Sequence, residues 1–86
     1  MARFESFERV QARVRTTLGR NVRELRLALG LSQGELADRA GTRRAFISDI
    51  ERGETNATLD SIVRIALALR VETHELLKRP NTKLAE

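Results

Sequence analysis

The sequence predicts an all-α protein built from five helices. Apolar residues recur at helical spacing along nearly the whole chain, and no segment shows the sustained alternation of a strand. Glycines and the single proline, Pro80, separate the helical segments, and serine or threonine precedes several of them as a potential cap. The 86 residues are enough for one small domain.

The N-terminal part of the chain contains the first helix and an extension that precedes it. The first helix is predicted to stop at Gly30, because apolar residues before that glycine repeat on one helix face, at Val22, Leu25 and Leu29. Residues 1–16 are predicted to form a helical extension. This extension either continues into the first helix or forms its own helix, with a break at Gly19 or at the Thr16–Thr17 pair.

Two short helices follow, separated by a tight turn at Gly41. Ser32 and Glu35 have the spacing of a capping box, which predicts the start of the second helix. Thr42 is predicted to cap the third helix, which Gly53 ends. The residues expected on the buried sides of these helices are Leu36, Ala37, Ala40, Ile47 and Ile50. A small residue at the helix crossing and a glycine in the turn favour a helix-turn-helix over an ordinary helical hairpin.

The C-terminal part of the chain predicts two more helices and a tail. Thr58 is predicted to cap a fourth helix that runs through Leu69, and Thr73 to cap a short fifth helix that ends before Pro80. Residues 79–86 are expected to form a C-terminal tail.

The two segments "LGLSQGELADRAG" and "ISDIERGE" closely resemble XRE/Cro-type helix-turn-helix proteins, which include phage repressors and restriction–modification controller proteins. The resemblance implies a compact, five-helix, lambda-repressor-like DNA-binding domain over residues 17–78. It also implies a homodimer that acts on a two-fold operator in double-stranded DNA. No cofactor is expected. The chain departs from the family pattern at Ala57, where proline is frequent, and at Arg70, where a helix-ending glycine is usual.

The outward side of the third helix carries the residues expected to read DNA bases. At about 100° per residue, this side lies opposite Ile47 and Ile50. The candidates for DNA contact on this side are Arg44, Ala45, Ser48, Asp49 and Arg52. Arg43 is a further candidate, because it lies at the first turn, where a long side chain can still reach outward. Arg44 is predicted to bind guanine through two hydrogen bonds, and Ala45 to contact a thymine methyl group.

Other polar residues suit the DNA backbone better than the bases. Ser48 and Arg52 fit phosphate, or a base edge contacted through water. Asp49 would be repelled by phosphate, so it either orients an arginine, accepts from cytosine, or belongs to an ordinary solvated face. Gln33, at the start of the second helix, matches the family's phosphate-binding glutamine, and Asn56 in the following loop is a second candidate.

The resemblance implies a structural ion pair between Arg26 of the first helix and Glu51 of the third. Such a pair would hold the recognition helix against the scaffold, and loss of one partner would be costly. The alternative is two unrelated surface charges.

Apolar residues on the fourth helix exceed what one core face needs. By helical angle, the core side is expected to contain Leu59, Ile62, Ile65, Ala66 and Leu69. Val63 and Leu67 project to a flank that requires a cover. The cover is predicted to be the two-fold mate, with the alternative that Phe4 and Phe7 fold back over the flank.

Charge and composition restrict the function further. The net charge is +4, and the first 53 residues contain 11 arginines against 7 acidic residues, a balance that favours a nucleic-acid partner. The chain has no cysteine and a single histidine, His74, so it offers no metal cluster and no nucleophile–base motif of an enzyme. No apolar run is long enough to cross a membrane, and a cytoplasmic location is expected. The alternative function is an interaction module of the same fold, such as an antitoxin that binds a toxin.

Overall fold

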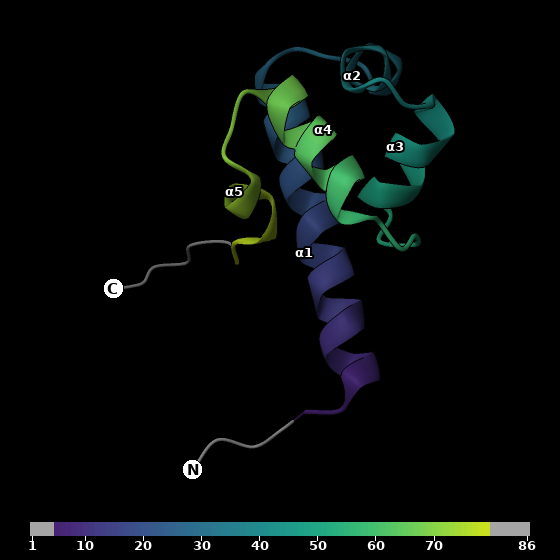
Figure 1. Ribbon diagram of the computed structural model, residues 1–86, viewed down its shortest axis with the longest axis vertical. Coiled ribbons are helices and arrows are strands. Elements are labelled where there is room, and N and C mark those ends of the chain that lie inside the picture. Colours follow the sequence, from purple (N-terminus) through teal and green to yellow (C-terminus); the bar gives the residue numbers. More distant parts are fainter. Residues whose placement is uncertain (1–4, 80–86) are drawn as a thin grey trace.

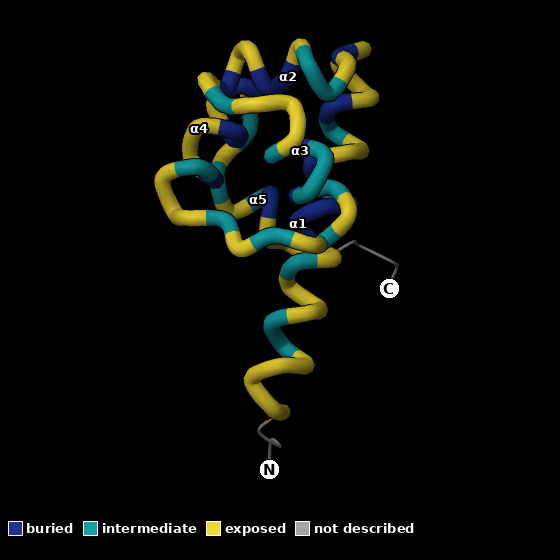
Figure 2. Tube along the Cα trace, turned by 90° about the vertical axis from the view of Figure 1, so that its right-hand side faces the viewer, coloured by how far each residue is buried: buried dark blue, intermediate teal, exposed yellow. Residues whose placement is uncertain are grey.

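The computed structural model describes residues 5–79, and in this range it contains α-helices and no strand, which confirms the predicted fold class (Figure 1). The helices are α1 (Phe7–Ala28), α2 (Gln33–Ala40), α3 (Arg44–Glu51), α4 (Leu59–Leu69) and α5 (Thr73–Leu77). Helices α3, α4 and α5 pack against the C-terminal half of α1, with α3 and α5 on opposite sides of it, and α2 packs against α3 and α4 (Figure 1). The N-terminal part of α1 projects beyond them and is largely exposed (Figure 2). Within the described residues, no helix is long and apolar enough to span a membrane.

Helix α1 is continuous, so residues 7–16 extend the first helix rather than forming a separate one. The hydroxyl oxygen of Ser6 caps the helix by accepting from the backbone N–H of Arg9 at 3.2 Å. Gly19 does not break the helix. Glycine is needed at this position because the backbone of α3 approaches α1 closely here. It is buried where α1 passes the end of α3, and a β-carbon there would lie 2.8 Å from the carbonyl oxygen of Glu51.

The predicted starts of α2 and α4 are confirmed. Ser32 and Glu35 form the capping box, with the Glu35 N–H donating to Ser32 Oγ at 3.0 Å and the Ser32 N–H to Glu35 Oε1 at 2.8 Å. Thr58 caps α4 by accepting from the Ser61 N–H at 3.1 Å. Gly41 ends α2 at φ +69°, a left-handed conformation that glycine adopts without steric cost.

The predicted caps of α3 and α5 are wrong by one residue. Arg43 is the N-cap of α3, and it makes no side-chain capping bond. The Thr42 N–H donates to the carbonyl oxygen of Ala37 at 2.9 Å, so Thr42 belongs to the turn that closes α2. Glu72, rather than Thr73, is the N-cap of α5, again without a side-chain capping bond. Threonine has a capping side chain in both places, but the backbone of the preceding turn decides where each helix begins.

The hydrophobic core lies where α1, α2, α3 and α4 meet and is closed by α5. Its buried residues are Leu18, Val22, Leu36, Ala37, Ala40, Ile47, Ile50, Ile62, Ile65, Ala66, Ala68, Leu69 and Leu76. The prediction that Leu59 faces the core is wrong, because its side chain is 71% exposed. Leu59 is the first residue of α4, and helical side chains lean toward the N-terminus, so Leu59 leans past the end of the core.

Asn21 fastens α5 to α1, a contact that the sequence did not indicate. Its Nδ2 donates to the carbonyl oxygens of Leu76 at 2.9 Å and Lys78 at 2.8 Å. These carbonyls lie at the C-terminal end of α5, where they have no partner within the helix. The Asn21 amide therefore satisfies the end of a helix too short to be stable alone.

Candidate nucleic-acid interface

The outward face of α3 is polar, while its inward face is fully buried. Ile47 and Ile50 are buried among α1, α2 and α4, as predicted. Arg44 and Ala45 are exposed at the N-terminal end of the helix, and Arg43, which precedes the helix, is exposed as well. A helix fixed by one apolar face can present its opposite face to a groove as a rigid unit.

Arg52 is held by three oxygen atoms at the C-terminal end of α3. Its guanidinium donates to Ser48 Oγ, to Asp49 Oδ1, and to Glu54 Oε1 at 3.0 Å. Asp49 therefore orients an arginine in the free protein, which is one of the alternatives that the sequence left open. Two carboxylates pair with the one guanidinium, so the positive charge of Arg52 is fully compensated and the end of α3 is not basic in the free protein.

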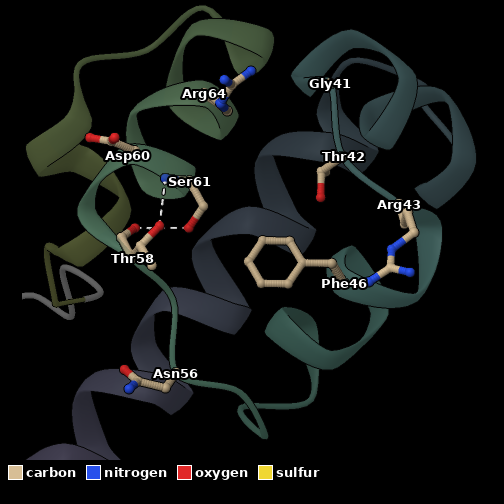
Figure 3. Close-up of a pocket in the computed structure, with 9 residues that line it drawn as sticks. All are labelled: Gly41, Thr42, Arg43, Phe46, Asn56, Thr58, Asp60, Ser61 and Arg64. Atoms are coloured by element: carbon tan, nitrogen blue, oxygen red, sulfur yellow. Dashed lines mark hydrogen bonds between the residues drawn. The ribbon is translucent and has the colours of Figure 1, made fainter.

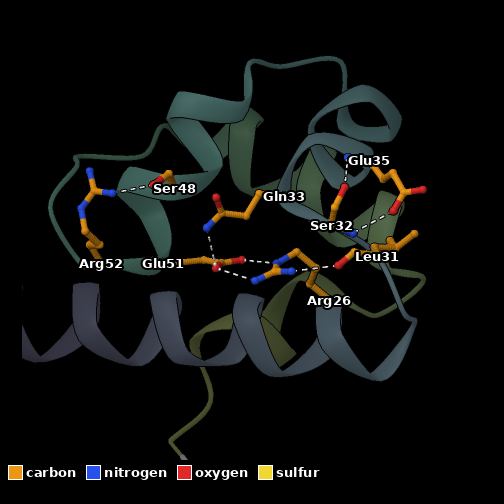
Figure 4. A network of polar contacts seen from close by, with 8 residues as sticks. All are labelled: Arg26, Leu31, Ser32, Gln33, Glu35, Ser48, Glu51 and Arg52. Atoms are coloured by element: carbon orange, nitrogen blue, oxygen red, sulfur yellow. Dashed lines mark hydrogen bonds and ion pairs between the residues drawn. The ribbon is translucent and has the colours of Figure 1, made fainter.

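Arg26 and Glu51 form the ion pair implied by the family resemblance (Figure 4). Arg26 Nε donates to Glu51 Oε2 at 2.6 Å, and Arg26 Nη2 donates to Oε1 at 3.0 Å. The two side chains are only 9% and 3% exposed. Arg26 also donates to the carbonyl oxygen of Leu31 at 2.8 Å. The guanidinium thus joins α1, α3 and the loop before α2.

Gln33 belongs to the same network. Its Nε2 donates to Glu51 Oε1 at 3.1 Å, a bond that the sequence did not predict. Burial alone would raise the pKa of Glu51, but the hydrogen bonds from Arg26 and Gln33 hold that pKa below its ordinary value. Glu51 therefore stays ionised and fixes the Gln33 side chain at the first residue of α2, where free N–H groups favour an anion.

A cleft of about 420 Å³ lies between the N-terminal ends of α3 and α4 (Figure 3). It is lined by Gly41, Thr42, Arg43, Phe46, Asn56, Thr58, Asp60, Ser61 and Arg64. Asn56, the loop candidate for a backbone contact, is exposed at this cleft. The sequence did not predict Phe46 as part of the site. Its position one turn before Ile50, on the same side of α3, indicated that its ring would lie beside the core. Its half-buried ring packs against the core.

Comparison with known proteins establishes the family. A family model described as helix-turn-helix (HTH_3) matches residues 22–76, which include all of α2 to α4. The chain belongs to this helix-turn-helix family. It is accordingly a DNA-binding transcription regulator, and the family is not enzymatic. Among residues 5–79, no group of three potential metal ligands occurs.

The relatives of this helix-turn-helix protein include control proteins. It is 43% identical over 65 residues to the control protein C.BamHI of Bacillus amyloliquefaciens, and the match spans 74% of this chain and 80% of the relative. It is 37% identical over 70 residues to the control protein C.SmaI of Serratia marcescens, and that match spans 81% and 83% of the two chains. The XRE-type resemblance seen in the sequence is confirmed by these matches.

Solved structures support the same assignment. The restriction-modification controller protein C.AhdI from Aeromonas hydrophila has a TM-score of 0.70 and 42% identity, and the match covers 72% of this chain and 94% of that one. The controller protein C.Esp1396I, solved as a tetramer with its natural 35 base-pair operator, has a TM-score of 0.66 and 29% identity. That match covers 86% of this chain and all of that one.

Proposed function

We propose that this chain binds a two-fold operator as a homodimer, with α3 in the DNA major groove. The observation that carries the proposal is the exposed polar face of α3, which the buried Arg26–Glu51 pair and Gln33 hold in a fixed position. The controller proteins among its relatives support an operator as the ligand, since one of them was solved on its operator as a tetramer.

The proposed contacts divide into base reading and backbone positioning. Arg44 binds guanine through O6 and N7, and Ala45 lies against a thymine methyl group. Arg43 reaches outward from the first turn of α3. Gln33 binds phosphate at the N-terminus of α2, and Asn56 binds phosphate beside the cleft. The remaining candidates, Ser48, Asp49 and Arg52, act together, because Arg52 must exchange an acidic partner for phosphate in order to bind it.

The proposed dimer interface lies on α4. Leu67 is 72% exposed, and Val63 is exposed on the same flank. Phe7, the first residue of α1, is 69% exposed. It lines a groove together with other residues of α1 and the loop before α4, and Leu67 does not line this groove. Phe4, the other residue considered as a cover, lies outside the described residues. A second copy of the chain is therefore the cover that we propose, and a two-fold dimer also gives the operator its symmetry.

Selection of bound duplexes from a random pool tests this function directly. We expect a motif with two-fold symmetry whose half-site centres are separated by about 10–10.5 base pairs or a multiple of that spacing. A selected motif without symmetry would contradict the homodimer, and failure to enrich any motif would contradict sequence-specific binding.

A further inference from the structure

Positive charge is concentrated on α1 rather than on the proposed recognition helix. Helix α1 contains six arginines and two glutamates, so its net charge equals the +4 of the whole chain. Helix α3 contains one arginine, one aspartate and one glutamate, and of the two arginines that flank it, Arg43 and Arg52, the second is paired with acidic side chains. Because neutralised phosphates dominate the affinity of proteins for duplex DNA, α3 is poorly equipped to supply that part of the binding energy.

Four of the arginines on α1 form a stripe along one side of the helix. At about 100° per residue, the stripe spans about 80° and lies opposite the core residues Leu18 and Val22. It consists of Arg9, Arg13, Thr16, Arg20 and Arg23, and we name it the arginine stripe. All five side chains are exposed. At 1.5 Å per residue, the stripe is about 21 Å long.

Two acidic residues, Glu5 and Glu24, lie beside the four arginines of the stripe, which therefore keeps a net positive charge. Arg13 pairs with Glu5 at 2.7 Å, and both side chains of this pair are open to solvent. Arg9, Arg20 and Arg23 form no ion pair with the described part of the chain. A shallow groove of about 290 Å³ runs between Arg13 and Arg20 and is also lined by threonines. Two guanidinium groups and hydroxyl groups beside an open groove are chemically suited to phosphate.

One end of the arginine stripe lies next to the proposed operator-binding surface. Arg23 lies on α1 between Gly19 and Arg26, which both contact Glu51, so this end of the stripe is near the Glu51–Gln33 contact. A duplex that reaches Gln33 must therefore pass close to Arg23. From there the stripe continues along α1, whose N-terminal part projects beyond the other helices (Figure 2).

We propose that the arginine stripe is a second DNA-binding surface, which contacts phosphates and supplies much of the sequence-independent affinity for duplex. This inference rests on the proposed function, because it requires DNA bound at α3. The stripe lies along a regular helix, and arginine side chains on a helix can follow a phosphate backbone without reading bases. It therefore sets affinity and salt dependence, whereas α3 sets sequence preference.

The test uses the full chain with Arg13→Gln and Arg20→Gln combined, because glutamine removes charge at exposed positions and keeps helix propensity. Binding is measured against salt concentration, on the duplex selected from the random pool and on a duplex of unrelated sequence. We expect the slope of log affinity against log salt to become shallower by about 0.9 for each phosphate that the variant no longer neutralises. Both duplexes should bind more weakly, and the selected motif should stay the same.

A variant with the same change of charge elsewhere is the control. Arg70→Asn combined with Lys78→Gln removes two charges at the end of α4 and beyond α5, and should leave the slope nearly unchanged. An unaltered slope in the Arg13→Gln, Arg20→Gln variant would overturn the inference. A variant whose oligomeric state changed while its DNA binding stayed normal would overturn it as well. If Arg44→Ala still altered the motif in that case, the proposed function would stand. If the unmodified chain bound no duplex, both proposals would fail.

Discussion

Gly19 of α1 lies directly against the backbone of Ile50 and Glu51 at the end of α3. A β-carbon at Gly19 would meet both carbonyl oxygens, and the backbone atoms that carry them cannot turn aside. Gly19→Ala should therefore destabilise the fold by about 1–3 kcal/mol, although alanine is the better helix former. Urea denaturation followed by circular dichroism measures the change.

Gly34→Ala is the matched control for Gly19→Ala. Gly34 is also helical, but a β-carbon there would have only Ser32 Oγ near it, at 3.9 Å. This variant should gain about 0.4–1 kcal/mol from reduced freedom of the unfolded chain. Equal effects of the two substitutions would contradict the close approach of α1 and α3.

Glu51→Gln should destabilise the fold by about 3–5 kcal/mol at neutral pH, because it leaves Arg26 buried without its counter-charge. Combining Arg26→Met with Glu51→Leu should cost much less, since both charges are removed together. Urea denaturation of the single and double variants checks this, and a double variant as unstable as Glu51→Gln would count against a buried ion pair.

The same carboxylate makes stability depend on pH in the acid range. The pKa of Glu51 is lower in the folded protein than its ordinary value, so its contribution is complete above the ordinary pKa of about 4.3. The contribution disappears as the pH falls through the lower, folded-state pKa. Thermal unfolding between neutral and acid pH should show this decrease, and the decrease should be smaller in the Arg26→Met, Glu51→Leu variant.

Arg44→Ala should relax the preference at one base position of each half-site and cost about 1–3 kcal/mol of binding free energy. Gln33→Ala should instead weaken all duplexes about equally, because its proposed partner is phosphate. Repeating the selection with each variant separates the two effects. An unchanged motif for Arg44→Ala would assign base reading to another residue of α3.

Arg70 adopts φ +62°, the only positive φ of a non-glycine residue in residues 5–79. The conformation lets the Val71 N–H donate to the carbonyl oxygen of Ala66 at 3.0 Å and close the end of α4. Since the left-handed conformation costs a side chain about 1 kcal/mol, Arg70→Gly should raise the melting temperature by several degrees. A lower melting temperature would mean that the arginine side chain contributes more than the strain costs.

Leu67→Glu should give a folded monomer that binds DNA far more weakly, because a charge in an apolar interface is costly. Light scattering gives the oligomeric state, and circular dichroism verifies the helices. Leu29→Glu, at an exposed apolar position outside α4, is the control. If the Leu67→Glu variant remained a dimer at micromolar concentration, the interface would lie elsewhere, and the groove beside Phe7 would be the next surface to test.

Local signals in the sequence determined most of the secondary structure and the family. Ser32 with Glu35 started α2, Gly41 ended it, and Thr58 started α4, because each of these devices acts within one turn of the chain. Ile47 and Ile50 identified the buried side of α3, since helical periodicity is also a local property. The motif around this helix was sufficient to predict a helix-turn-helix domain.

Tertiary structure alone decided the features that depend on contacts between distant segments. Gly19 resembled a helix break, but the passage of α3 explains it as a site of close approach. The bond from Gln33 to Glu51 and the exposure of Leu59 depend on where neighbouring helices end. The exposure of the arginine stripe has the same origin, because the helices that contact α1 pack against its opposite side and leave the stripe open to solvent. The partners of Arg52, by contrast, are local, since Ser48, Asp49 and Glu54 lie within four residues of it.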